Sequence, residues 1–212
     1  MNLERLLCGG VLLLWLLGAG SAWATQEVRI GILAKRGAEQ TSVRWQPTAD
    51  YLSARLPEHR FRIVPLDFKR IYEVAARHEV DFVLANSVIY VDLEVRYGAS
   101  SVVTLHNRGP HGEGITEFGG VIFTRANRKD LSNLKDLTGK RFAAVEENSF
   151  GGYLMALREL KHQGIEPADD FKSLSFVGTH DAVVEAVLSG QADAGTVRSE
   201  ERRVGKECRS RW

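Results

Sequence analysis

Short apolar runs alternate along the chain with segments in which apolar residues recur at helical spacing. The first run, residues 28–34, is apolar enough for a strand buried on both faces of a parallel sheet. In residues 45–56 the apolar side chains recur at helical spacing, and Pro57 ends the pattern. The same criteria predict strands over residues 61–66, 80–85, 101–105, 119–124, 142–145, 171–177 and 192–197, and helices over residues 71–77, 88–97, 151–162 and 181–188. The repeated strand–helix–strand order predicts an α/β fold with a parallel or mixed sheet covered by helices.

A polar, glycine-rich stretch at residues 107–114 separates the two halves of this pattern. Domain boundaries fall in such segments, so we expect one domain over residues 25–110 and a second over residues 111–200. Residues 201–212 hold five basic and two acidic side chains. Their abrupt composition resembles a read-through peptide at the ends of unrelated truncated reading frames, and we expect this tail to be non-native.

The N-terminal segment, residues 1–24, has the pattern of an export signal. Arg5 precedes an apolar stretch over residues 11–17, and the segment closes on small residues ending at Ala24, after which we expect cleavage. The uncharged run over residues 6–24 is also long enough for an uncleaved membrane anchor, and this alternative stays open. In both cases we expect the body of the chain in a periplasm.

Charge and cysteine content narrow the choice of partners and chemistry. The chain has 28 Lys and Arg against 27 Asp and Glu, a net charge of +1, so no global field favours a nucleic acid. Both cysteines, Cys8 and Cys208, lie near the ends, which leaves residues 25–200 without a thiol for a disulfide, a metal ligand or a nucleophile. The histidines and glutamate within residues 106–113 fit no strong metal signature, and we expect neither a metal nor another cofactor.

Three predicted strand ends carry candidate chemistry, because ligands of open α/β sheets bind beyond the carboxyl ends of the strands. After the strand at residues 142–145, Asn148 and Ser149 precede a helix that opens with two glycines. This pattern suits an anion cradle of hydroxyl, amide and backbone N–H groups, and it suits a simple N-cap by Ser149 equally well. His180 stands at a similar turn and can donate to an oxyanion, and Arg198 follows the last strand, where its guanidinium can grip an anion.

Two further interpretations involve neighbouring residues. A triad of Ser149, His180 and Asp181 suggests an exported hydrolase, but adjacent His and Asp side chains diverge, so Asp181 is poorly placed to orient His180. Lys35, Arg36, Arg44 and Trp45 follow the first strand and suit either the edge of a cleft or a solvated surface. We expect no catalysis and keep the hydrolase only as an alternative.

Four segments carry a family resemblance in their order and spacing, namely residues 133–142, 148–153, 178–182 and 190–195. Together they resemble the PhnD-like, phosphonate-type periplasmic solute-binding proteins, over about residues 27–200. The resemblance implies a type II periplasmic binding protein, whose two lobes are joined by a hinge and close on a ligand in the cleft between them.

The resemblance also implies site residues, with some departures. In phosphonate binders of the family, the helix start at positions 149–151 carries three hydroxyl residues, and His180 and Tyr90 match a histidine and one of two tyrosines. Here Phe150, Gly151 and Phe68 lack the hydroxyl, which argues against a phosphonate because its oxygens would be less well satisfied. Arg198, near the position of an acidic group in aminophosphonate binders, favours a more anionic ligand. We expect a small anionic solute bound by Tyr90, Asn148, Ser149, Phe150, Gly151, His180 and Arg198, with phosphonate, phosphate, sulfur oxyanion and carboxylate all open.

Residues 118–125, 149–152 and 192–198 resemble even more closely the extracytoplasmic input domains of hybrid sensor histidine kinases of the tetrathionate-sensor type. That resemblance implies a domain that reports a small molecule to its own membrane helix and kinase core, whereas a free solute-binding protein delivers it to an ABC permease. The 212 residues contain no kinase motif. Because type II binding proteins cross back to complete their first lobe, we also expect this chain to be a fragment whose first lobe is incomplete.

Overall fold

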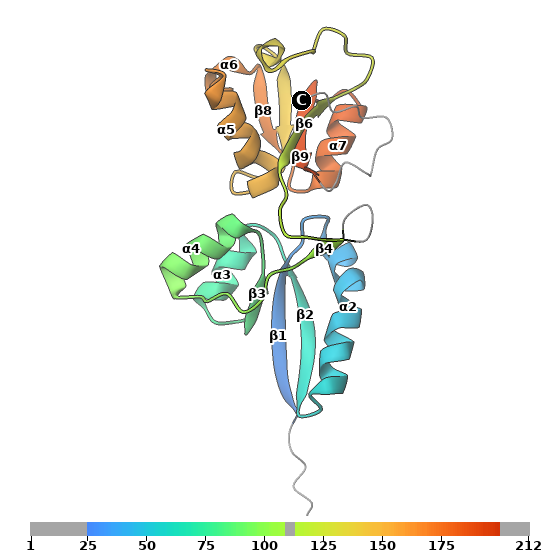
Figure 1. The fold of residues 1–212 in the computed structure, drawn as a ribbon, viewed down its shortest axis with the longest axis vertical. Helices are drawn as coiled ribbons and strands as arrows, with labels where there is room; N and C mark the ends of the chain where they lie inside the picture. The colour runs from blue at the N-terminus through green and yellow to red at the C-terminus, as the bar shows by residue number, and fades with distance from the viewer. Residues whose placement is uncertain (1–24, 109–112, 200–212) are drawn as a thin grey trace, which may run out of the picture.

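The first sheet of the computed structural model has the strand order β2-β1-β3, and all its strands are parallel. β1 (Gln26–Leu33) and β2 (His59–Leu66) pair along their whole length, and β3 (Phe82–Leu84) pairs with the end of β1. The helices after these strands are α2 (Ala38–Arg55), α3 (Arg70–Ala76) and α4 (Ser87–Tyr97). We call these elements the first lobe (Figure 1). The structure describes residues 25–108 and 113–199, so the expected export signal and C-terminal tail lie outside the described residues.

The second sheet has the order β6-β9-β7-β8. Its strands are β6 (Gly120–Thr124), β7 (Arg141–Ala144), β8 (Ser173–Phe176) and β9 (Ala194–Arg198). β7 runs parallel to both its neighbours, whereas β6 is antiparallel to β9. Its helices are η3 (Leu134–Leu137), the π-helical turn η4 (Phe150–Leu154), α5 (Met155–His162), α6 (Pro167–Asp170) and α7 (His180–Leu188). This second lobe lies above the first in Figure 1.

A short antiparallel pair, β4 (Asn107–Arg108) with β5 (Gly114–Ile115), falls within the polar stretch where the sequence predicts a boundary. From β5 the chain runs to β6 in the second lobe (Figure 1). No helix within the described ranges is both long and apolar enough to cross a membrane.

The central strand β7 explains why the second lobe folds as the pattern predicts. Phe142, Ala143 and Ala144 are each at most 1% exposed, as expected for a strand covered by helices on both faces. Phe142 belongs to a buried cluster with residues of α5, and Ala143 to another with residues of α7. The second of these clusters also contains buried residues of the first lobe, so hydrophobic packing is continuous across the two lobes.

Two predicted elements differ in the structure. The helix predicted over residues 45–56 begins at Ala38 in the structure. The sequence did not predict this start, because the residues before Trp45 are mostly polar and show no apolar periodicity. The strand predicted over residues 101–105 is wrong: these residues have no regular structure, and Val102 and Val103 are 72% and 79% exposed. An extended segment needs partners for its backbone groups, and no described strand pairs with this run.

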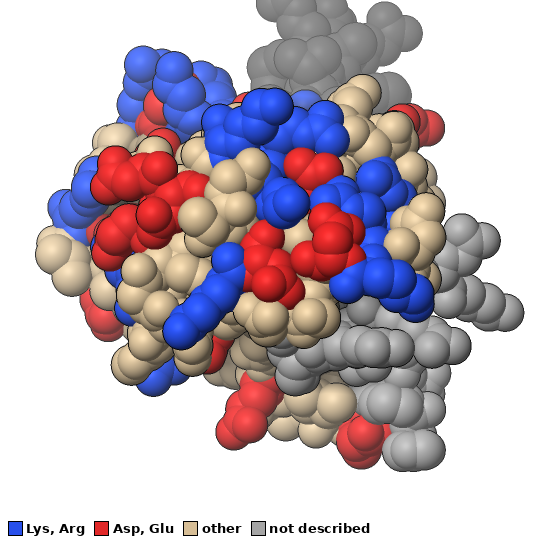
Figure 2. Space-filling model, turned by 90° about the horizontal axis from the view of Figure 1, so that it is seen from above, with Lys and Arg blue, Asp and Glu red and all other residues tan. Residues whose placement is uncertain are grey.

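The amino-terminal ends of β7 and β9 are joined by an ionic cluster around Asp193. The carboxylate accepts hydrogen bonds from Arg128 Nη1 at 2.7 Å and from Nη2, Nε and the backbone N of Arg141 at 3.0 Å each. The bonds from Arg141, followed by that from Arg128, hold the pKa of Asp193 well below its usual range despite its burial. Acidic and basic side chains are interspersed over the end of the second lobe that Figure 2 shows.

Candidate ligand-binding site

Ser149 stands between the end of β7 and the first turn of η4. Its backbone is extended (φ −79°, ψ 106°), its side chain makes no capping hydrogen bond, and the residue is only 2% exposed. The Ser149 carbonyl accepts hydrogen bonds from the N–H groups of Tyr153 at 2.9 Å and Leu154 at 3.1 Å. The second of these bonds spans five residues and makes the turn π-helical. The simple N-cap interpretation of Ser149 therefore does not hold for its side chain.

The Ser149 hydroxyl lies inside this turn, against Gly152. A Cβ on Gly152 would lie 2.5 Å from Ser149 Oγ and 2.5 Å from Val145 Cγ2, so only glycine fits there. The first N–H groups of a helix have no partner within it. The hydroxyl thus lies at the N-terminus of the helix, where backbone N–H groups point outward and the helix dipole is positive. Such an arrangement stabilises negative charge.

His180 is the first residue of α7 and is 3% exposed. Thr179 caps the helix by accepting a hydrogen bond from the Ala182 N–H at 3.1 Å. The ring Nδ1 of His180 accepts a hydrogen bond from the backbone N–H of Arg198 at 3.3 Å. A neutral ring that accepts at Nδ1 carries its proton on Nε2, so the imidazole has its donor at Nε2. The same hydrogen bond joins the carboxyl end of β9 to the start of α7.

This geometry disfavours the hydrolase alternative. A triad histidine uses one ring nitrogen toward the nucleophile and the other toward the carboxylate, but Nδ1 of His180 is engaged by the Arg198 amide. Asp181 instead forms an ion pair with Arg36, whose Nε lies 3.8 Å from Asp181 Oδ1.

The first lobe contacts the start of α7. The Lys35 carbonyl accepts a hydrogen bond from the His180 N–H at 3.3 Å, and the ion pair of Arg36 with Asp181 lies beside it. The sequence left Lys35 and Arg36 between a cleft edge and a solvated surface, and the structure brings both to the second lobe. Their position just after β1 was the sequence signal for a place at the cleft edge, but the sequence did not identify the residues that they contact.

Asn148 forms the other link between the lobes. Its side-chain Nδ2 donates to the Tyr72 hydroxyl at 3.2 Å, and its backbone carbonyl accepts from the side-chain amide of Asn86 at 3.5 Å. The Tyr72 hydroxyl in turn donates to Asp92 Oδ2 at 2.8 Å. Burial, followed by the hydrogen bond to Asp92, raises the pKa of Tyr72. Sequence reasoning missed Tyr72 because a tyrosine in the middle of a short helix carries no signal of an interlobe contact.

Tyr90 is not brought into this network by the hydrogen bonds of the described residues. Its hydroxyl donates to Glu94 Oε1 at 2.8 Å, one turn along α4, and this bond raises the pKa of Tyr90. Phe68, which stands where the second family tyrosine is expected, is 7% exposed and packs in the hydrophobic core. No cluster of metal-binding side chains occurs among residues 25–108 and 113–199.

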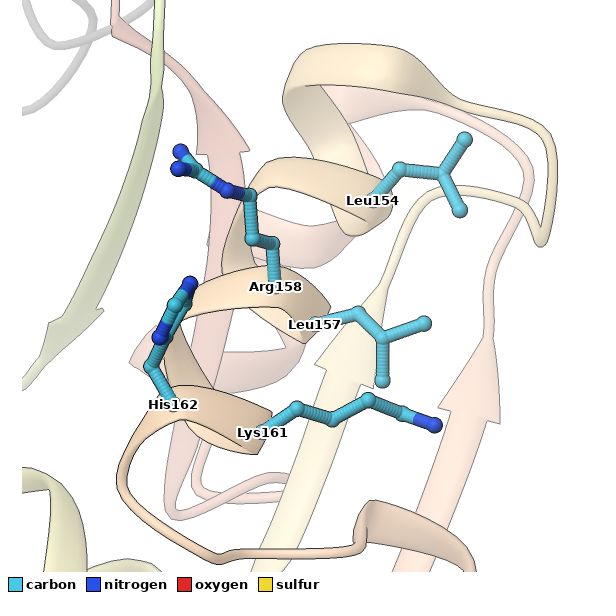
Figure 3. A pocket seen from close by; sticks show the side chains of 5 residues that line it. All are labelled: Leu154, Leu157, Arg158, Lys161 and His162. Atoms are coloured by element: carbon cyan, nitrogen blue, oxygen red, sulfur yellow. The ribbon is translucent and has the colours of Figure 1, made fainter.

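A separate depression of about 490 Å³ lies along α5 (Figure 3). It is lined by Leu154, Leu157, Arg158, Lys161 and His162. None of the predicted site residues lines it, so this depression is distinct from the strand ends described above.

Comparison with known proteins decides the family. The family model for the periplasmic substrate-binding protein of phosphonate ABC transporters matches residues 30–207. The chain belongs to this family. It is also 35% identical, over 157 residues, to the tetrathionate sensor histidine kinase TtrS of Salmonella typhimurium. That alignment covers 74% of this chain and 26% of the kinase, so the chain spans about a quarter of the length of this relative.

Solved structures of the family share the fold. PhnD1 from Prochlorococcus marinus in complex with methylphosphonate matches with a TM-score of 0.74 and 22% identity, covering 89% of this chain and 72% of that one. The binding protein component of an ABC phosphonate transporter from Pseudomonas aeruginosa matches with a TM-score of 0.75 and 16% identity, covering 89% and 65%. The expected type II periplasmic binding protein fold and the predicted resemblance are therefore confirmed. The family is one of extracytoplasmic solute-binding proteins and not of enzymes.

Within this family member, positions 150 and 151 have other contacts in place of hydroxyl groups. Phe150 packs against Phe118 with ring centroids 5.6 Å apart and an interplanar angle of 86°. A Cβ on Gly151 would lie 2.9 Å from Arg198 Cγ and 3.1 Å from Phe118 Cε2. Gly151 thus lets the stem of Arg198 approach the π-helical turn.

Proposed function

We propose that the chain binds a small oxyanion between its two lobes and performs no chemistry on it. The observation that carries this proposal is the Ser149 hydroxyl, which is buried, makes no capping bond and lies against Gly152 in the first turn of a helix. Arg198 and His180 come from the neighbouring strand and helix ends, and they add a guanidinium and an imidazole donor. Together these groups offer charge-assisted hydrogen bonds to a ligand of negative charge.

Tetrathionate is the first ligand to test, ahead of a phosphonate. The identity of 35% with the tetrathionate sensor supports a sulfur oxyanion. Phe150 and Gly151 supply no side-chain donors, whereas a phosphonate has three oxygens that each need a partner in a desolvated site. Each sulfonate end of tetrathionate also has three oxygens, but they share a single negative charge and accept hydrogen bonds more weakly than those of a phosphonate, so they depend less on donors at positions 150 and 151.

The identity with the sensor kinase also supports a role as an input domain, with a membrane helix and a kinase core as partners. The family match supports the second candidate, a periplasmic component that delivers its ligand to an ABC permease. Sequencing the source locus across the codon for Glu200 separates them. A frame that runs on into a membrane helix and a kinase core supports the sensor, and one that encodes only the rest of a binding protein supports the transporter.

Isothermal calorimetry with tetrathionate and with methylphosphonate tests the binding site. We expect Ser149→Ala and Arg198→Ala each to weaken binding by about 1 to 3 kcal/mol, as for other charge-assisted contacts. Ser173→Ala and Arg158→Ala are matched controls, because both residues are exposed and neither lies at the carboxyl end of a strand. Unchanged affinity in both site variants, or no binding of either anion by the parent chain, contradicts the proposal.

A further inference from the structure

Phe118 contacts the guanidinium of the proposed site. The Cζ atom of Arg198 lies 5.3 Å from the centroid of the Phe118 ring. The same ring is in T-shaped contact with Phe150, at 5.6 Å between centroids. A guanidinium within about 6 Å of an aromatic centroid is attracted by the ring's electron density. Phe118 is therefore held by Phe150 and is itself in contact with the charged end of Arg198.

The backbone around this contact is fixed by the β6–β9 pair. Gly120 is the strand partner of Arg198, and one residue further Gly119 and Ser199 bond to each other twice. The Gly119 N–H donates to Ser199 Oγ at 3.0 Å, and the Gly119 carbonyl accepts from the Ser199 N–H at 2.8 Å. Neither Gly120 opposite Arg198 nor Gly151 against its stem has a side chain. Among the described residues, Phe118 is an aromatic side chain in contact with the guanidinium.

We propose that Phe118 is a positioning residue, whose ring holds the Arg198 guanidinium in the orientation that anion binding requires. This inference rests on the proposed function, because it concerns the arginine of that site. A free arginine samples many rotamers, and an arginine ordered before the ligand arrives loses less entropy on binding. A contact with an aromatic ring does not use the N–H donors of the guanidinium in conventional hydrogen bonds, so Arg198 can still bond an oxyanion in a bidentate manner.

Calorimetry with tetrathionate, on the full chain and its variants, tests the positioning role. We expect Phe118→Leu to weaken binding about 3-fold to 30-fold, the range of a cation–π contact, and Phe118→Tyr to bind within about 2-fold of the parent. Phe176→Leu is the matched control, because Phe176 forms a T-shaped pair with Tyr153 in the same lobe and does not contact Arg198. In an Arg198→Ala background, Phe118→Leu has no further effect.

The outcomes separate this inference from the proposed function. If Arg198→Ala leaves the affinity unchanged, the proposed site is wrong and the inference with it. If Arg198→Ala weakens binding but Phe118→Leu does not, only the positioning role is overturned. The same holds if Phe118→Leu weakens binding as much in the Arg198→Ala background as in the parent. A ligand-free readout is the upfield ring-current shift of the Arg198 side-chain protons in NMR spectra. This shift is expected in the parent and in Phe118→Tyr and is lost in Phe118→Leu, and its absence from the parent contradicts the inference.

Discussion

Replacing Gly151 by alanine tests whether the shape of the π-helical turn holds Arg198 in place. The added Cβ lies 2.9 Å from Cγ and 3.1 Å from Cβ of Arg198, and 3.1 Å from Phe118 Cε2. Two of these atoms belong to the stem of Arg198, next to the β9 backbone, so they cannot retreat without moving the guanidinium. Overpacking of this kind costs about 1–3 kcal/mol, and we expect the free energy of unfolding to fall by that amount in urea denaturation.

The same displacement weakens ligand binding. A charged hydrogen bond contributes about 1.5–3 kcal/mol, and a loss of about half of it raises the Kd for tetrathionate about 4-fold to 12-fold in calorimetry. Gly119→Ala is the matched control, because no atom lies within 4 Å of a Cβ built there. If Gly151→Ala and Gly119→Ala both match the parent in stability and affinity, the structure does not depend on glycine at position 151 and the reasoning is refuted.

Three further variants test other features in urea denaturation. Asp193→Asn lowers the free energy of unfolding at pH 7 by about 1–3 kcal/mol, because it removes the carboxylate that Arg141 contacts and one of the two that Arg128 contacts, whereas Arg128 keeps Asp130. The pKa of Asp193 is lowered in the folded state. The difference in unfolding free energy between Asp193→Asn and the parent is therefore constant down to about pH 5 and narrows below about pH 4. A difference that does not change with pH contradicts this. Tyr72→Phe costs about 1 kcal/mol, because it removes the hydroxyl between Asn148 and Asp92, and unchanged stability would mean that this interlobe link is weak. Thr196→Val leaves stability unchanged or raises it by about 1 kcal/mol, because the Thr196 hydroxyl is fully buried without a hydrogen-bond partner; a loss of stability would show that the hydroxyl has a structural role.

The strands β7 and β9 were predictable from sequence because burial on both faces favours a run of apolar and small residues. The run at residues 101–105 has the same composition, yet it forms no strand, because strand formation also depends on a neighbour that composition does not reveal. The start of α2 was missed for the opposite reason. Its first turns are mostly polar, and the residue buried there is Thr41, so no apolar face marks where the helix begins.

The strand ends of the second lobe could be identified from sequence as candidate sites, because a parallel strand followed by a helix places its turn at one edge of the sheet. Ser149, His180 and Arg198 were found in this way, and the structure links the last two directly. Phe118 and Tyr72 could not be found, because their contacts join segments far apart in the chain. The approach of Gly151 to Arg198 likewise depends on the packing of η4 against β9.

The order β6-β9-β7-β8 has a consequence for synthesis of the protein on the ribosome. β6 and β7 are both made before β9, yet they do not pair with each other, and each needs β9 as its neighbour. Until residues 194–198 have left the exit tunnel, the nascent second lobe therefore has unpaired strand edges and exposed apolar side chains of the future core. During this interval the nascent chain is most exposed to aggregation, and we expect chaperones that bind apolar segments to act on it then.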